Sequence, residues 1–130
     1  MVYLFLSDGF EEIEALTPVD VLRRAGVEVK TVSIMPDIMV MGAHGIQVKA
    51  DMLLDGYDED CAEMLILPGG SQGTENLGAN DRLREIILSA VNRELYVAAI
   101  CAAPTILAKM GLLKGLKATC YHSLASVLID

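Results

Sequence analysis

The stretch "YVAAICAAPTILA" (96–108) places a cysteine between an apolar run and a proline. The apolar run 96–100 is typical of a buried strand, and Cys101 follows it directly. Pro104 suits the first turn of a helix, where no N–H is needed, and Gly111 suits the position just after its end. The stretch therefore predicts a strand, a turn at Cys101 and a helix over 104–110.

Strands and helices alternate along the rest of the chain. Apolar runs at 2–6, 27–34 and 63–70 predict three further strands. A helix opened by Asn80 is predicted from apolar side chains at helical spacing: Leu83, Ile86, Ile87, Ala90 and Val91. Alternation of this kind indicates an α/β fold with a mainly parallel sheet.

The segment 11–26 is expected to be helical at least in its second half. Thr17 fits a helix N-cap with Pro18 at the first helical position, and Gly26 lies past the end. Residues 11–16 form either a turn before this helix or its own N-terminal part, kinked at Pro18. Residues 37–51 carry glycines at turn positions between apolar flanks, which predicts a small hairpin.

The composition fits a single domain and excludes several classes of protein. With 130 residues, 53 % of them hydrophobic, the chain can form one real core. A net charge of −8 disfavours nucleic acid, whose phosphates carry the same sign. No apolar run approaches the roughly 20 residues of a membrane helix, and no signal peptide is visible, so a cytoplasmic location is expected. The cysteines at 61, 101 and 120 form neither a zinc pattern nor a disulfide framework.

Three chemically active features stand at predicted strand ends, which a parallel sheet gathers at one edge. Glu14 follows the first strand, Gly69 and Gly70 end the third, and Cys101 ends the fourth. A free cysteine is usually a small core residue, but at a strand-to-helix turn the helix N-terminus favours a thiolate nucleophile. The pattern alone leaves both interpretations of Cys101 open.

Two supports for a nucleophilic cysteine can be identified. The motif "LPGGSQG" (67–73) is either a tight turn or a source of backbone donors, and the N–H groups of Gly70 and Ala102 would together form an oxyanion hole beside Cys101. Glu14, if it turns inward, would share a proton with the sulfur, because two charges are unfavourable in one buried site. Glu11 and Glu12 are expected in solvent or at the helix N-terminus.

Three separated motifs carry a resemblance to a known family: "GFEEIEALTPVDVLRRAGVEV" (9–29), "LILPGG" (65–70) and "AAICAAPTILAKMGLLKG" (98–115). They resemble the ThiJ/PfpI family of the class I glutamine amidotransferase-like superfamily, in particular its branch of the parkinsonism-associated protein deglycase. The resemblance implies a flavodoxin-like three-layer sandwich with helices on both faces and a nucleophile elbow after a central strand. It also implies a reactive Cys101 hydrogen-bonded by a protonated Glu14, with Gly70 and Ala102 as backbone donors.

An elbow of this kind predicts a positive φ at Cys101 and ordinary backbone at Cys61 and Cys120. Ala102 stands where the peptidase-like branch has a histidine, and Tyr121 where some deglycase-branch members have one, with His122 a residue further on. No Cys-His-Asp triad is therefore expected.

Family members generally continue for roughly fifty to sixty residues more, in line with the usual size of a domain. Residues 1–130 are accordingly expected to be a single ThiJ/PfpI-like domain that lacks its C-terminal strand and helix.

The resemblance implies a hydrolase-type enzyme, a cysteine-dependent deglycase or glyoxalase that acts on small reactive carbonyls such as methylglyoxal, or on glycated protein, under oxidative stress. It requires no cofactor and no metal, and it implies a homodimer formed through the first helix, with Arg23, Arg24 and His44 near the boundary. The main alternative is a non-enzymatic redox sensor or stress chaperone that uses the oxidisable Cys101. A thiamine-related enzyme and an intracellular cysteine peptidase are further alternatives, the latter disfavoured by the missing histidine.

Overall fold

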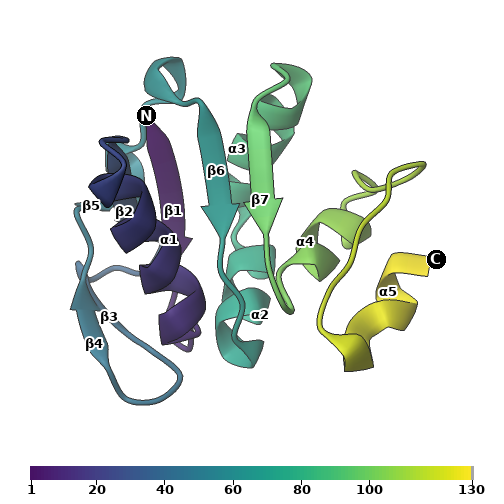
Figure 1. Ribbon diagram of the computed structural model, residues 1–130, viewed down its shortest axis with the longest axis horizontal. Helices are drawn as coiled ribbons and strands as arrows, with labels where there is room; N and C mark the ends of the chain where they lie inside the picture. Colours follow the sequence, from purple (N-terminus) through teal and green to yellow (C-terminus); the bar gives the residue numbers. More distant parts are fainter. Residues whose placement is uncertain (130) are drawn as a thin grey trace.

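A five-stranded parallel sheet forms the middle layer of the computed structural model, which describes residues 1–129 (Figure 1). Its strands are β1 (Val2–Leu6), β2 (Val29–Ser33), β5 (Met52–Leu53), β6 (Met64–Leu67) and β7 (Tyr96–Ala99). They lie in the order β5-β2-β1-β6-β7, and each neighbouring pair is parallel. The register brings Leu4 of β1 beside Thr31 and Ile66, and Ile66 beside Ala98.

Helices cover both faces of this sheet, as predicted (Figure 1). The helices are α1 (Glu12–Arg24), α2 (Ser71–Ala79), α3 (Asp81–Asn92), α4 (Pro104–Lys109) and α5 (Ala125–Ile129), with 3-10 turns η1 (Leu54–Gly56), η2 (Glu59–Cys61) and η3 (His122–Leu124). The hairpin predicted within 37–51 is confirmed as the antiparallel pair β3 (Met39–Met41) and β4 (Gln47–Lys49).

The two faces of β1 carry the two halves of the core, because successive strand residues point to opposite sides. Tyr3 and Phe5 belong to the cluster that packs under α2, α3 and α4. Val2, Leu4 and Leu6 belong to the cluster that α1 and the hairpin cover. All five strand residues are buried, which explains why this strand has an apolar run rather than an alternating pattern.

Helix α1 begins earlier than Thr17, so the prediction of an N-cap there is wrong. The cap is Glu11, whose side chain accepts a hydrogen bond from the N–H of Glu14, and Pro18 lies inside the helix. The alternative, in which residues before Pro18 belong to the same helix, is the one found. Its predicted end is confirmed, since Gly26 has φ 82° and its N–H bonds to the carbonyl of Arg23.

Helix α2 was not predicted, since its sequence begins with a glycine-rich turn motif. Gly73 lies on its inner side, where a Cβ atom would come within 2.9 Å of the Phe10 backbone. The glycine therefore permits close packing of the helix on the loop after β1. Asn80 closes α2 and opens α3, where its side chain accepts the N–H of Leu83, and this predicted cap is confirmed.

The cysteine turn follows an edge strand, which corrects the expected position after a central strand. Among the described residues β7 pairs only with β6, because residues 117–121 form no strand beside it. No helix in the described part of the chain is long and apolar enough to cross a membrane.

Candidate active site

Cys101 occupies a strained turn between β7 and α4. Its φ is 60°, which confirms the predicted positive value, whereas neither Cys61 nor Cys120 has a positive φ. The turn is closed by a hydrogen bond from the Ala103 N–H to the Ile100 carbonyl at 3.0 Å. Glu94 also has a positive φ, of 58°, so this conformation alone does not define a site. At Cys101 it has a chemical consequence, because charged and polar groups lie around the side chain.

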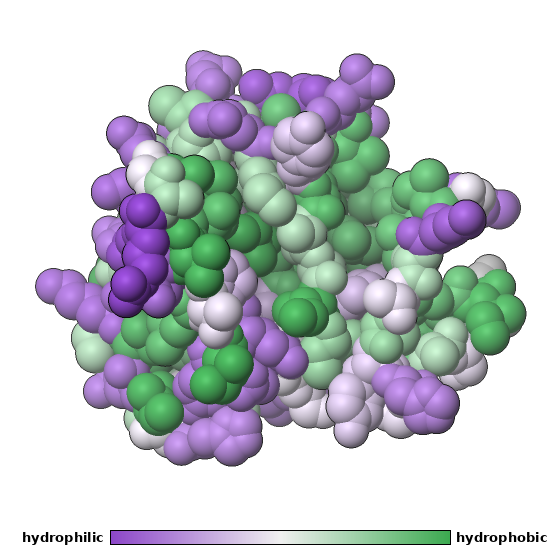
Figure 2. All heavy atoms as spheres, in the orientation of Figure 1, coloured by the Kyte–Doolittle hydropathy of each residue, from purple (hydrophilic) through white to green (hydrophobic). Residues whose placement is uncertain are grey.

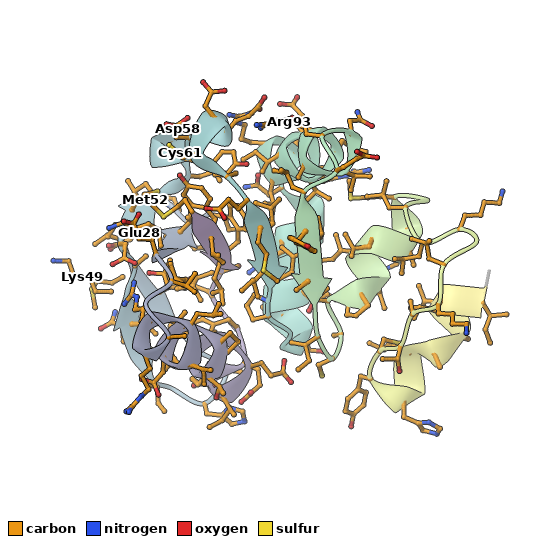
Figure 3. All side chains as sticks on the ribbon, turned by 45° about the horizontal axis from the view of Figure 1, so that its top comes forward. Glu28, Lys49, Met52, Asp58, Cys61 and Arg93 are labelled. Carbon is orange, nitrogen blue, oxygen red and sulfur yellow. The ribbon has the colours of Figure 1, made fainter. Side chains whose placement is uncertain are left out.

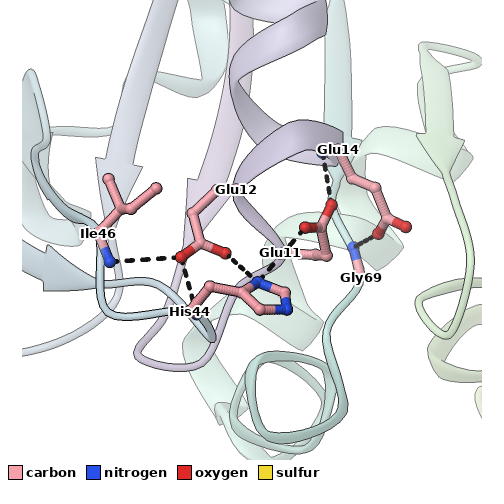
Figure 4. A network of polar contacts seen from close by, with 6 residues as sticks. All are labelled: Glu11, Glu12, Glu14, His44, Ile46 and Gly69. Carbon is pink, nitrogen blue, oxygen red and sulfur yellow. Dashed lines mark hydrogen bonds and ion pairs between the residues drawn. The ribbon is translucent and has the colours of Figure 1, made fainter.

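Glu14, Gly69 and Cys101 meet at one point at the carboxyl edge of the sheet. Glu14 Oε1 accepts the N–H of Gly69 at 3.0 Å (Figure 4). A Cβ atom added at Gly69 would lie 2.5 Å from Glu14 Oε1 and 2.9 Å from Cys101 Cβ. The glycine is thus the spacer that lets the carboxylate of α1 reach the cysteine turn. Sequence reasoning identified Glu14 and Cys101 but assigned no role to Gly69, whose place in "PGG" was the available signal.

The environment of Cys101 raises the pKa of its thiol. Burial is the main cause, and the negative charge of Glu14 and the hydrogen bond between the two groups add to it, while the Ala102 N–H acts in the opposite direction. This is contrary to the expected stabilisation of a thiolate by the helix N-terminus. The physical reason is that burial disfavours the charged thiolate and that the carboxylate of Glu14 lies beside the sulfur. The negative charge of Glu14 therefore opposes formation of the Cys101 thiolate.

The two predicted oxyanion donors are the N–H groups of Gly70, at the start of α2, and of Ala102, directly after Cys101. Gly70 has φ 96° and is the N-cap residue of α2, and among the described residues no protein acceptor takes its N–H. The N–H of Ala102 faces the sulfur of Cys101 and lowers its pKa. The role of these two N–H groups as oxyanion donors stays a prediction.

A second polar cluster lies next to this site, at the start of α1 (Figure 4). Burial would raise the pKa of the Glu12 carboxyl, but hydrogen bonds from the His44 ring and from the N–H groups of His44 and Ile46 lower it to about 2. Conversely, the hydrogen bond to Glu12 and its charge raise the pKa of His44. Glu12 was expected in solvent or at the helix N-terminus: it is the first residue of α1, as the second alternative had it, and it is buried rather than solvated.

This cluster is the one group of described residues that brings three metal-binding side chains together. One ligand atom each of Glu11, Glu12 and His44 lies within 4.8 Å of the others. His44 Nδ1 is hydrogen-bonded to Glu12 Oε1 at 2.8 Å, so the donor atoms satisfy one another. We therefore describe the cluster as a closed hydrogen-bonded network and assign no metal to it.

Two cavities border the site. One of about 320 Å³ lies between α1 and the strands β6 and β7, and is lined by Glu14 and apolar side chains that include Pro18, Val21, Ile66 and Ile100. Figure 2 shows apolar residues gathered over β6 and β7 on this face. A larger cavity of about 440 Å³ lies between α2 and α4 and touches Ala102. Cys101 lines neither cavity. Because Glu14 lines the smaller one, we regard that cavity as the route by which a substrate reaches the site.

The remaining cysteines lie in different surroundings. Cys61 is at the opposite, amino edge of the sheet, where Figure 3 shows it beside Asp58. Its Sγ bonds to Asp58 Oδ2 at 3.1 Å, and this contact and its negative charge raise the pKa of the Cys61 thiol. Cys120 is half-buried, and its Sγ lies 3.4 Å from the carbonyl oxygen of Tyr121.

The segment after α4 meets the cysteine turn through its backbone. The N–H of Tyr121 donates to the Cys101 carbonyl at 2.7 Å, while the side chains of Tyr121 and His122 are exposed. The three residues that were predicted near a dimer boundary form ion pairs within the chain. Arg23 pairs with Asp51 at 2.7 Å, Arg24 with Asp20 at 3.0 Å, and His44 with Glu12.

The fold and site define a parallel α/β protein with a cysteine elbow supported by a glutamate. Residues 1–129 match the model of the DJ-1/PfpI family. The chain belongs to this family.

The known proteins similar to this chain extend beyond the part that it matches. It is 35 % identical to deglycase PfpI of Pyrococcus furiosus, matching 100 % of this chain and 78 % of the relative. It is 32 % identical to protein DJ-1 homolog B of Arabidopsis thaliana, over 96 % of this chain but 29 % of the relative. The solved structure of oxidized Toxoplasma gondii DJ-1 superimposes with a TM-score of 0.93 at 33 % identity, covering 97 % of this chain and 69 % of that one.

Proposed function

We propose that the protein is a cysteine-dependent enzyme of deglycase or glyoxalase type, which acts in the cytoplasm on reactive carbonyls such as methylglyoxal or on their protein adducts. The observation that carries the proposal is the meeting of Cys101, at φ 60°, with the carboxyl group of Glu14 over Gly69. The Pyrococcus furiosus relative is named a deglycase, which supports this substrate class.

The first step uses the nucleophile and the two backbone donors. The sulfur of Cys101 adds to the aldehyde carbon of methylglyoxal, and the aldehyde oxygen becomes an oxyanion. The N–H groups of Gly70 and Ala102 would stabilise that charge. The thiol proton passes by way of Glu14 to the oxyanion, so the adduct is a neutral hemithioacetal and Glu14 is again a carboxylate.

The second step is a proton transfer for which Glu14 is the acid and base. Its carboxylate removes the hydrogen on the former aldehyde carbon and returns a proton to the neighbouring ketone carbon, through an enediol. The result is a lactoyl thioester on Cys101. Water then cleaves the thioester and releases lactate and the free thiol. One carbon is oxidised as its neighbour is reduced, so atoms and electrons balance without a cofactor.

The test follows methylglyoxal loss and lactate formation without added glutathione or metal. Cys101→Ser should be almost inactive, because an unactivated hydroxyl is a far poorer nucleophile. Glu14→Gln keeps the shape but carries no proton, and should lose about 100-fold or more. Cys120→Ser is the matched control for a thiol outside the site and should change little. Equal turnover in all four proteins would contradict the assignment.

The second candidate function is a redox sensor or stress chaperone. Its specific support is that the similar Toxoplasma gondii protein is described as oxidized. Absence of turnover in every variant, together with selective peroxide oxidation of Cys101, would favour this function over the enzyme.

We further propose that the protein acts as a homodimer through α1. Helix α1 exposes Ile13 at 71 % and Val21 at 56 %, which gives this helix apolar surface that a second copy of the chain would cover. A stable dimer should bury about 1,200 Å² or more in total. Sedimentation that shows a monomer at all working concentrations would remove this part of the proposal.

A further inference from the structure

The turn between β3 and β4 is built around the carboxylate of Glu12. Glu12 is 4 % exposed, and its Oε2 accepts the N–H of His44 at 2.8 Å and that of Ile46 at 3.4 Å. Its Oε1 lies 2.8 Å from Nδ1 of the His44 ring. A Cβ atom at Gly42 would come within 2.5 Å of the same carboxylate. The hairpin is therefore fastened to the first turn of α1 by one buried acid and one histidine.

The same contacts continue from this turn to Glu14 and Gly69 (Figure 4). Glu11 Oε1 lies 3.7 Å from His44 Nδ1, while Glu11 Oε2 accepts the N–H of Glu14. The N–H of Glu11 donates to the Gly69 carbonyl at 3.0 Å, and the N–H of Gly69 donates to Glu14. Gly69 and the first turn of α1 are thus bonded in both directions, and His44 contacts the outer end of this network.

The network contains more negatively charged side chains than positively charged ones. Three carboxylates, those of Glu11, Glu12 and Glu14, crowd the first turn of α1. Within ion-pair distance of Glu11 and Glu12 the described residues provide one cationic side chain, that of His44. After burial and Glu14, the charge of Glu11 also opposes the Cys101 thiolate. A proton on His44 therefore offsets a negative charge that acts on Cys101.

We infer that His44 is a positioning residue of the Cys101 site: it holds the β3–β4 turn on Glu12 and balances the charge of Glu11, whose N–H is bonded to Gly69 beside the cysteine turn. The importance of this role for catalysis rests on the proposed function. The groups that determine the protonation of His44 are Glu11 and Glu12, and those that determine that of Cys101 are Glu14, Glu11 and the Ala102 N–H. His44 touches no reacting atom, so its effect must pass through Glu11.

The test is the pH profile of Cys101 alkylation by iodoacetamide, read by mass spectrometry on the Cys101 peptide. His44→Gln retains a hydrogen-bond donor and removes the charge, so the profile should shift to higher pH. At a pH just below neutral the rate should fall about threefold or more, which corresponds to about half a pKa unit. His44→Arg restores a cation and should restore the rate. His122→Gln is the matched control, since His122 is an exposed histidine outside the network.

A double-mutant cycle separates this role from a purely structural one. Glu11→Gln can still cap α1 and should by itself shift the profile to lower pH. In the Glu11→Gln background, His44→Gln should have almost no further effect, because the charge it balances is gone. A His44→Gln profile that superimposes on that of the unmodified protein would overturn the inference. So would an equal effect in both backgrounds, or a shift that His44→Arg fails to reverse.

The alkylation readout does not depend on turnover of a carbonyl. If methylglyoxal is not consumed but the cycle behaves as described, the proposed enzyme function fails and the positioning role stands. If methylglyoxal is consumed and the cycle shows no coupling, the enzyme function stands and the positioning role fails.

Discussion

Substitution of Gly69 by alanine should damage the site while leaving both of its reactive side chains in the sequence. The added Cβ would lie 2.5 Å from Glu14 Oε1, 2.9 Å from Cys101 Cβ and 3.1 Å from the Ile100 carbonyl oxygen. Two of these three atoms belong to the strained turn and cannot move freely. The carboxylate is the most mobile of the three, so Glu14 should be displaced from the Gly69 N–H.

The expected loss of stability can be worked from these contacts. Overpacking of this kind costs about 1–3 kcal/mol. Replacement of glycine by alanine stabilises the protein by about 0.4–1 kcal/mol, because the unfolded chain becomes less flexible. The net expectation is a loss of about 1–2 kcal/mol. For a chain of this length that lowers the Tm by about 4–8 °C.

Gly78→Ala is the matched control, since it makes the same chemical change inside α2. Its Cβ would meet only Ile106 Cγ1, at an ordinary 3.5 Å. Alanine at such a helical position stabilises by about 0.5–1 kcal/mol, so the Tm should rise. The assay is thermal unfolding of both variants, together with alkylation of Cys101. The reasoning is refuted if Gly69→Ala is as stable as Gly78→Ala and its Cys101 pH profile is unchanged.

The other predictions concern pH and helix capping. The pKa of Glu12 is lowered from 4.5 to about 2. The stability that the ionised Glu12 contributes is therefore complete above pH 4.5 and is lost as the pH falls through the lowered value. The pKa of His44 is raised from 6.5. The stability that protonated His44 contributes is therefore complete below pH 6.5 and is lost as the pH rises through the raised value. Denaturant titrations should thus show the largest gap between the unmodified protein and His44→Gln at pH values from 4.5 to 6.5; a gap independent of pH would contradict the pairing. Asn80→Ala removes the cap on the Leu83 N–H and should cost about 1 kcal/mol, whereas Asn92→Ala, at the last helical position, should cost much less in the same titration.

Much of the architecture could be predicted because each element carries a local signal. The apolar run of β1, the Asn80 cap and Pro104 after the cysteine all act through neighbours in the chain. The positive φ of Cys101 followed from the same local pattern, a strand that turns abruptly into a helix. Glu14 was placed at the correct edge of the sheet by topology alone.

The features that were missed depend on contacts between distant segments. Helix α2 has poor local signals, and its Gly73 is explained only by the Phe10 backbone against which it packs. The early start of α1 depends on a side-chain cap at Glu11, a residue type that is not a preferred cap. The Glu12–His44 pair joins residues that are 32 positions apart, so no spacing in the sequence could reveal it.

The parallel pairing of β1 with two partners has a consequence for the order in which the chain folds. Val2 pairs with Val29 and with Met64, which are 27 and 62 positions further on (29 − 2 and 64 − 2). Closing the longer loop costs roughly 0.7 kcal/mol more, so the β1–α1–β2 unit is favoured to form first. Glu14 belongs to that early unit, while Gly69 and Cys101 join it only when β6 and β7 dock. In this order the thiol of Cys101 acquires its glutamate partner only after β6 and β7 have docked.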